Sequence, residues 1–139
     1  MKKLVFISIL YFCSNTFYAQ KKKGTGAVFK FDKELIDYGK IAYKSDGKRI
    51  FNFTNIGSEP IVINDIKTSC DCTVPSIPKE PIMPNEKGTI EVVYDTSKSG
   101  GFSKVITIFS NAKKGRATLR IKGFVEKKIK FFSLIGNLL

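Results

Sequence analysis

The sequence predicts an all-β fold, an immunoglobulin-like antiparallel β-sandwich of about seven strands preceded by a signal peptide. Short runs alternate between apolar and polar residues with a period of two, which is the side-chain period of a β-strand. Turn residues rich in Gly, Asn, Asp and Pro separate these runs, and no stretch within the domain has a helical period. We therefore expect one sandwich domain over residues 28–126.

The strand pattern recurs in order along the chain. Gly39 falls inside the second segment, where it predicts a kink or a bulge. Residues 74–84 hold four prolines, which exclude a central strand or a helix and predict an extended connection. Pro84-Asn85 then suits a tight turn. The expected strands are 28–31, 35–41, 49–55, 61–68, 88–95, 102–110 and 117–126.

The N-terminus has the parts of a secretory signal peptide. Two lysines precede the apolar run Leu4–Phe12, and Ala19 is a small residue suited to cleavage, so residues 1–19 are expected to be removed. The run is shorter than the roughly 20 residues that cross a bilayer, so the mature form is expected to have no transmembrane span. Acylation at Cys13 is an alternative, although the residues before it lack the required small side chains. The expected location is the periplasm, the cell surface or the outside of the cell.

The composition argues against an enzyme. The chain has no His, which removes the usual general base, the usual zinc ligand and the usual partner of a Ser or Cys nucleophile. Its formal net charge is +12, carried mostly by Lys, whereas nucleic-acid recognition favours Arg. We expect no cofactor and no nucleic acid. The charge is interpreted as a solvated surface or as attraction to an anionic surface such as lipid headgroups.

Two segments outside the sandwich have their own composition. Residues 20–27, a basic and Gly-rich stretch, are expected to form a flexible leader. Residues 127–139 combine a basic start with apolar residues at near-helical spacing. This tail is interpreted either as an amphipathic helix that contacts a membrane or a partner, or as a terminal segment that packs on the sandwich or frays.

Cys70 and Cys72 are the residues best placed to carry chemistry. In an extended strand their side chains point to the same side and their Cα atoms lie about 6.5 Å apart, near the upper limit for a disulfide. A bridge would therefore need a local turn, which the residues around Asp71 can supply. An oxidising compartment favours such a bridge.

Three interpretations of this pair stay open. The cysteines can be structural, as a small disulfide clip or as two packed thiols. They can form a redox dithiol, although the carboxylate of Asp71 would raise rather than lower the thiol pKa. They can also bind Cu(I) with Met83 as a third sulfur ligand. Zinc is not expected, because two cysteines without His leave only carboxylates to complete a tetrahedron.

An ordered set of motifs resembles a known family. Over about residues 29–126 the chain is similar to a bacterial family of exported domains of unknown function, with an immunoglobulin-like sandwich related to major-sperm-protein and cilium-associated modules. Asp71 and Asn85 stand where that pattern commonly has Gly. The matching elements are Phe51-x-Phe53-x-Asn55-x-Gly57-x-x-Pro60-x-x-Ile63, Ser69-Cys70-Asp71-Cys72-Thr73, Pro84-x-x-x-Gly88-x-Ile90, Gly101, Ser110-Asn111 and Ile121-x-Gly123-x-Val125.

The resemblance implies a fold and export but no established activity. The sequence therefore predicts a non-enzymatic module in the cell envelope that binds an unknown envelope or extracellular protein, or that serves a structural role. The alternative is a thiol redox or Cu(I)-handling protein that uses Cys70 and Cys72.

Overall fold

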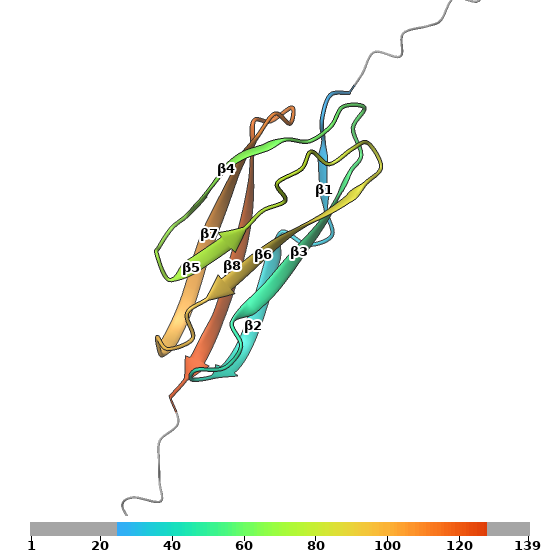
Figure 1. Ribbon diagram of the computed structural model, residues 1–139. Coiled ribbons are helices and arrows are strands. Elements are labelled where there is room, and N and C mark those ends of the chain that lie inside the picture. Colours follow the sequence, from blue (N-terminus) through green and yellow to red (C-terminus); the bar gives the residue numbers. More distant parts are fainter. Residues whose placement is uncertain (1–24, 128–139) are drawn as a thin grey trace, which may run out of the picture.

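Alternating apolar residues give each strand one face that is buried in a shared interior. In a computed structural model, which describes residues 25–127, the strands form two four-stranded sheets packed face to face (Figure 1). This arrangement confirms the predicted all-β sandwich. The strands are β1 (Phe29–Phe31), β2 (Leu35–Ala42), β3 (Lys48–Asn55), β4 (Ile63–Thr68), β5 (Thr73–Ser76), β6 (Lys87–Tyr94), β7 (Gly100–Ser110) and β8 (Arg116–Glu126).

The two sheets have the strand orders β1-β3-β6-β5 and β2-β8-β7-β4. Every second residue of the central strands faces the space between the sheets, as the period of two requires. The side chains buried to less than 2 % exposure come from both sheets, so the two layers share one core. The largest of them are Phe51, Phe53, Ile61, Ile90, Ile106, Ile108, Leu119 and Ile121.

β5 is the strand that the sequence analysis did not predict. It lies at the edge of its sheet and pairs only with β6. The amide of Asp95 donates to the carbonyl of Cys72, so the backbone groups of Cys72 face β6. Backbone groups of successive residues point to opposite sides of a strand, so those of Val74 also face β6, and the nitrogen of Pro75 points away from it. A proline is tolerated at such a position because no ladder hydrogen bond is lost. The Pro-rich connection therefore begins after Ser76.

One strand pair departs from the predicted antiparallel arrangement. β2 runs parallel to β8, while the other strand pairs are antiparallel. The pairing shifts register between Asp37 and Lys40, at the bulge predicted for Gly39, whose φ is 62°. The predicted turn at Asn85 is also confirmed, since this residue has a φ of 67°.

The change of sheet between β1 and β2 leaves part of one strand edge uncovered. β1 pairs with β3 in one sheet, and after the short turn at residues 32–34 the chain continues as β2 in the other sheet. The two strands occupy successive stretches along the length of the sandwich (Figure 1). As a result β2 covers the edge of β8 only from Arg120 onward.

The boundary of the domain differs from the one predicted. Ala27, which was assigned to the flexible leader, is 2 % exposed and belongs to the core. The carbonyl of Gly26 accepts the amide of Ser58, and Gly57 lets the two backbones approach because a side chain there would collide with Gly26. One small buried residue produces no periodic pattern, so the sequence did not reveal it.

The signal peptide predicted for residues 1–19 lies outside the described residues, as do most of the leader and all but the first residue of the tail. Within residues 25–127 there is no helix long and apolar enough to cross a membrane.

Candidate functional site

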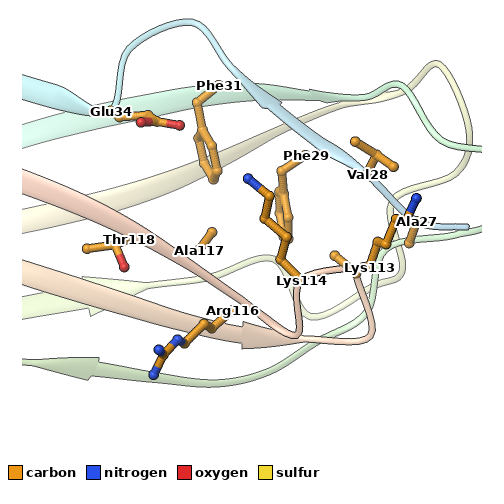
Figure 2. A pocket seen from close by; sticks show the side chains of 11 residues that line it. Ala27, Val28, Phe29, Phe31, Glu34, Lys113, Lys114, Arg116, Ala117 and Thr118 are labelled. Carbon is orange, nitrogen blue, oxygen red and sulfur yellow. The ribbon is translucent and has the colours of Figure 1, made fainter.

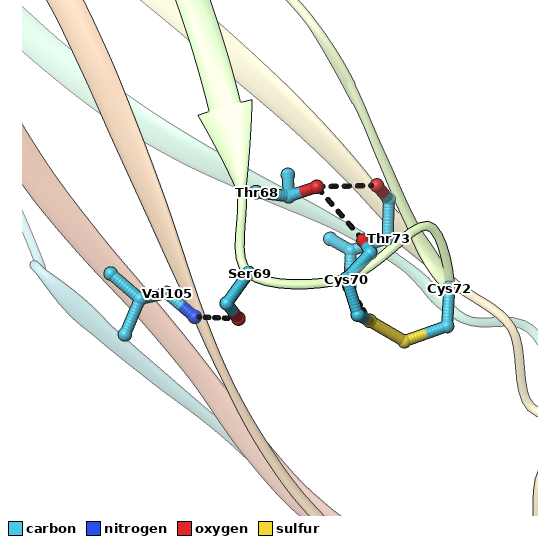
Figure 3. The surroundings of a disulfide bond; sticks show 6 residues. All are labelled: Thr68, Ser69, Cys70, Cys72, Thr73 and Val105. Carbon is cyan, nitrogen blue, oxygen red and sulfur yellow. Dashed lines mark hydrogen bonds between the residues drawn. A yellow bond between two sulfur atoms is a disulfide. The ribbon is translucent and has the colours of Figure 1, made fainter.

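The cysteine pair lies in the turn that connects the two sheets. Cys70 and Cys72 are joined by a disulfide in the turn between β4 and β5, and their Cα atoms are 5.3 Å apart (Figure 3). This spacing is shorter than that of an extended strand, because the chain turns at Asp71. The pair is thus brought together as a bridge and not as two separate thiols.

Hydrogen bonds fix this turn to both neighbouring strands. The hydroxyl of Thr68 donates to the carbonyl of Cys70 at 2.8 Å, and the amide of Val105 donates to the hydroxyl of Ser69 at 3.1 Å (Figure 3). The amide of Thr73 donates to the carbonyl of Cys70 at 3.4 Å. Cys72 is buried and Cys70 half-buried, so the bridge packs on the end of the core.

Asp95 lies beside the disulfide turn, and its carboxylate accepts hydrogen bonds from Ser97. The amide of Asp95 donates to the carbonyl of Cys72. Hydrogen bonds from the hydroxyl and the amide of Ser97 lower the pKa of Asp95 below its ordinary value, and the side chain is fully ionised at neutral pH. The backbone beside the disulfide is therefore held by a second small polar turn.

The structure does not bring Met83 to the cysteines. Met83 lies in the turn that precedes β6, where its carbonyl accepts the amide of Glu86. Cys72 lies beside the other end of β6, an eight-residue strand of about 25 Å. The predicted three-sulfur set is therefore not assembled, because the Pro-rich connection runs the full length of the sheet. Residues 25–127 also contain no cluster of three or more His, Cys, Asp or Glu side chains suited to a metal.

Replacement of Cys70 and Cys72 together by serine tests the structural contribution of the bridge. The loop that it closes has three residues, so the chain-entropy model gives a loss of about 1.5 kcal/mol in the free energy of unfolding. Chemical denaturation of the oxidised protein and of the double variant measures this loss. A loss above about 4 kcal/mol would contradict the assignment of a small local clip and would indicate that the turn organises the core.

A groove that the sequence analysis missed lies between β1 and β8 (Figure 2). It has a volume of about 430 Å³. Phe29 and Phe31 form one wall, with their rings stacked at 5.2 Å between centroids, and both are half-buried. Ala117 and Thr118 of β8 form the opposite wall. The groove is therefore an aromatic wall facing a strand edge.

Two backbone hydrogen bonds mark the ends of the groove. At one end the amide of Lys113, in the turn between β7 and β8, donates to the carbonyl of Ala27 at 3.1 Å. At the other end the amide of Arg120 donates to the carbonyl of Glu34 at 2.8 Å. Between these two contacts the two walls are not joined by any β-ladder of the described chain.

The edge of β8 is open along this groove. Arg120 directs its amide toward β2, and residues of a strand alternate in direction, so Arg116 and Thr118 point their N–H and C=O groups the same way. β2 begins pairing only at Arg120, so these four backbone groups have no ladder partner among residues 25–127. A strand edge with unused donors and acceptors is a template for pairing with another chain.

The groove could not be recognised from strand periodicity. Alternation over residues 28–31 predicts only that Phe29 and Phe31 share one face of a strand, and Lys113-Lys114 lie between two predicted strands, where a polar turn is expected. The only signal was the shortness of the first strand, which leaves part of its neighbour uncovered. A short first strand indicates an uncovered edge only if the next strand joins the other sheet, as the chain does after residues 32–34.

Comparison with protein families agrees with the fold. Residues 29–125 match the model described as "Protein of unknown function (DUF1573)". The chain belongs to the DUF1573 family. No curated protein matches its sequence.

Solved structures share the fold of this DUF1573 chain. A protein of unknown function from Porphyromonas gingivalis W83 is 14% identical with a TM-score of 0.63, and the match covers 70% of this chain but only 46% of that protein. The PapD-like domain 7 of human CEP192 is 6% identical with a TM-score of 0.63, covering 79% of this chain and 93% of that domain. A chaperone–tip adhesion subunit complex of Acinetobacter baumannii is 14% identical with a TM-score of 0.52, covering 72% and 58%. At these identities the likeness shows the fold alone.

Proposed function

We propose that this DUF1573 chain is an exported, non-catalytic module of the cell envelope that binds another protein in the groove between β1 and β8. The observation that carries the proposal is the open edge of β8 at Arg116 and Thr118, placed opposite the aromatic wall. Unpaired backbone groups supply affinity for another chain, and an apolar wall supplies burial.

Two further features support this proposal. The N-terminal pattern of residues 1–19 predicts export. The chaperone–adhesion subunit complex described above shows that a sandwich of this fold occurs in a protein–protein complex, although the groove and not this likeness carries the argument.

Photo-crosslinking in the native cell tests the proposal. A benzophenone amino acid at Thr118, on the rim of the groove, is expected to yield covalent adducts with a distinct protein. The matched control carries the same group at Thr89, which is exposed on the outer face of β6, and is expected to yield none. Absence of adducts from position 118, or equal adducts from both positions, would overturn the proposal. Sequencing of the N-terminus of the purified protein tests export, with Gln20 as the expected first residue.

A further inference from the structure

We infer that the groove accepts an extended segment of its partner, which adds to β8 as a short strand and carries an Asp or Glu at the end that faces Lys113 and Lys114. This inference rests on the proposed function and specifies the chemistry of its ligand. Three independent features of the groove carry it: the direction of the backbone groups, the size of the side chains on its walls, and the distribution of charge.

The backbone groups fit a strand and not a helix or a loop. The N–H and C=O groups of Arg116 and Thr118 lie in the plane of their sheet and alternate with residues that pair with β7. On the opposite side, Ile56 donates to the carbonyl of Val28, and Asp32 donates to the carbonyl of Asn52. By the same alternation, the backbone groups of Phe29 and Phe31 face away from β3. A chain in the groove thus meets strand edges on both sides.

The length of the open edge limits the ligand to a few residues. It runs from Arg116 to Leu119, about 13 Å of strand, and pairing with β2 begins at the next residue, Arg120. The Lys113–Ala27 contact closes the other end. Four residues can therefore pair in register, and a longer segment must turn out of the groove at both ends.

The walls accept small or β-branched side chains at alternate positions. Ala117 contributes only a methyl group to the wall, which leaves room beside it for a side chain of the ligand. The rings of Phe29 and Phe31 are backed by Phe53, with centroids 5.0 and 5.6 Å away, and this packing holds them in place. A ligand side chain that points inward is buried against rigid aromatic faces.

The charges in the groove are distributed unequally. Lys113 and Lys114 line the end near Ala27, and the side chain of Lys114 lies beside Phe29 (Figure 2). Glu34 lines the opposite end (Figure 2). Arg116 projects on the far side of β8 from the phenylalanine rings and adds to the positive field from there (Figure 2). An acidic residue of the ligand is therefore stabilised at the lysine end and repelled at the Glu34 end.

A synthetic peptide with blocked ends is a direct probe of this chemistry. Two probes are used, acetyl-Glu-Thr-Val-Thr-Val-Thr-amide and acetyl-Thr-Val-Thr-Val-Thr-Glu-amide, so that in either strand orientation one of them places its single acid at the lysine end and away from Glu34. Titration of that peptide into nitrogen-15-labelled protein is expected to shift the amide signals of Arg116–Leu119 and Phe29–Phe31. Replacement of its Glu by Lys is expected to weaken binding by about 3- to 10-fold at low salt.

A matched pair of variants isolates the backbone contribution. Thr118→Pro removes an amide that faces the groove and not β7, so the ladder with β7 keeps its hydrogen bonds. It is expected to weaken peptide binding by about 3- to 10-fold, the value of one hydrogen bond. Thr118→Val keeps the amide and is expected to bind more tightly than Thr118→Pro, so the difference between the two variants measures the backbone contribution.

The ligand itself supplies a test that does not depend on the folding of a variant. N-methylation of the two Val residues removes peptide donors that a strand would use and is expected to abolish the shifts. Equal binding of the methylated peptide, or shifts confined to another surface, would overturn the inference. Absence of peptide binding together with adducts at position 118 in cells would overturn the strand-addition inference alone, whereas absence of those adducts would overturn the proposed function. Binding to phosphatidylglycerol vesicles without any response to the peptide would favour an anionic surface and would also overturn the inference.

Discussion

Replacement of Asn55 by alanine is expected to lower the free energy of unfolding by about 3 to 5 kcal/mol. The side chain is fully buried at the end of β3 and bonds to four backbone groups. Its Nδ2 donates to the carbonyls of Glu59 and Ile82 at 2.8 and 2.9 Å. Its Oδ1 accepts the amides of Gly57 and Val28 at 2.9 and 3.4 Å. Alanine leaves all four backbone groups without this hydrogen-bond partner. The side chain is fully buried, so water does not readily replace it.

Asn52→Ala is the matched control for this experiment. Asn52 lies on the same strand but is exposed, so its replacement is expected to change the free energy of unfolding by less than about 0.5 kcal/mol. Urea denaturation of both variants measures the difference. A loss below about 1 kcal/mol in Asn55→Ala would show that the turns joined by this side chain are held by other contacts.

Gly47→Ala is expected to have the second large effect, a loss of about 3 kcal/mol in the free energy of unfolding. A methyl group at Gly47 would collide with the carbonyl oxygen of Tyr94 and would lie 3.1 Å from a methyl carbon of Thr96. The carbonyl of Gly47 also accepts the amide of Tyr94 at 3.0 Å and the hydroxyl of Tyr38 at 2.7 Å. A backbone shift that relieves the collision therefore disturbs hydrogen bonds from Tyr94 of one sheet and Tyr38 of the other. Burial raises the pKa of Tyr38 to about 12, so its hydroxyl remains a donor at neutral pH.

Gly101→Ala provides the comparison for Gly47→Ala. A methyl group at Gly101 would meet only the ring of Phe124, at an ordinary contact distance of 3.7 Å. Its melting temperature is expected to stay within a few degrees of that of the unchanged protein, and that of Gly47→Ala to fall by more than 10 °C. Similar melting temperatures for the two variants would mean that β3 and β6 can separate locally at little cost.

The strands were predictable because burial of one face imposes a period of two. Phe51 and Phe53 alternate with polar residues in the sequence and alternate between core and solvent in the structure. The bulge at Gly39 and the turn at Asn85 were predictable for a related reason, since both require backbone conformations that few residues adopt.

The features that were missed depend on distant parts of the chain. β5 contains Pro75, and a proline is compatible with a strand only if the strand lies at an edge, which the sequence does not state. Met83 is close to the cysteines in sequence but a full strand away in space. The groove depends on β1 and β2 belonging to different sheets, and periodicity is identical whichever sheet a strand joins.

The edge formed by β5 has a consequence for self-association. Thr73 and Pro75 are the residues of β5 whose backbone faces outward, and neither offers a free amide: Thr73 donates to Cys70, in the disulfide turn, and Pro75 has none. Strand exchange between copies of the chain needs two receptive edges per molecule to propagate. In the sheet that contains β5, one of the two edges is closed to incoming acceptors. Growth of this sheet into a continuous filament through its β5 edge would therefore lack amide donors from Thr73 and Pro75.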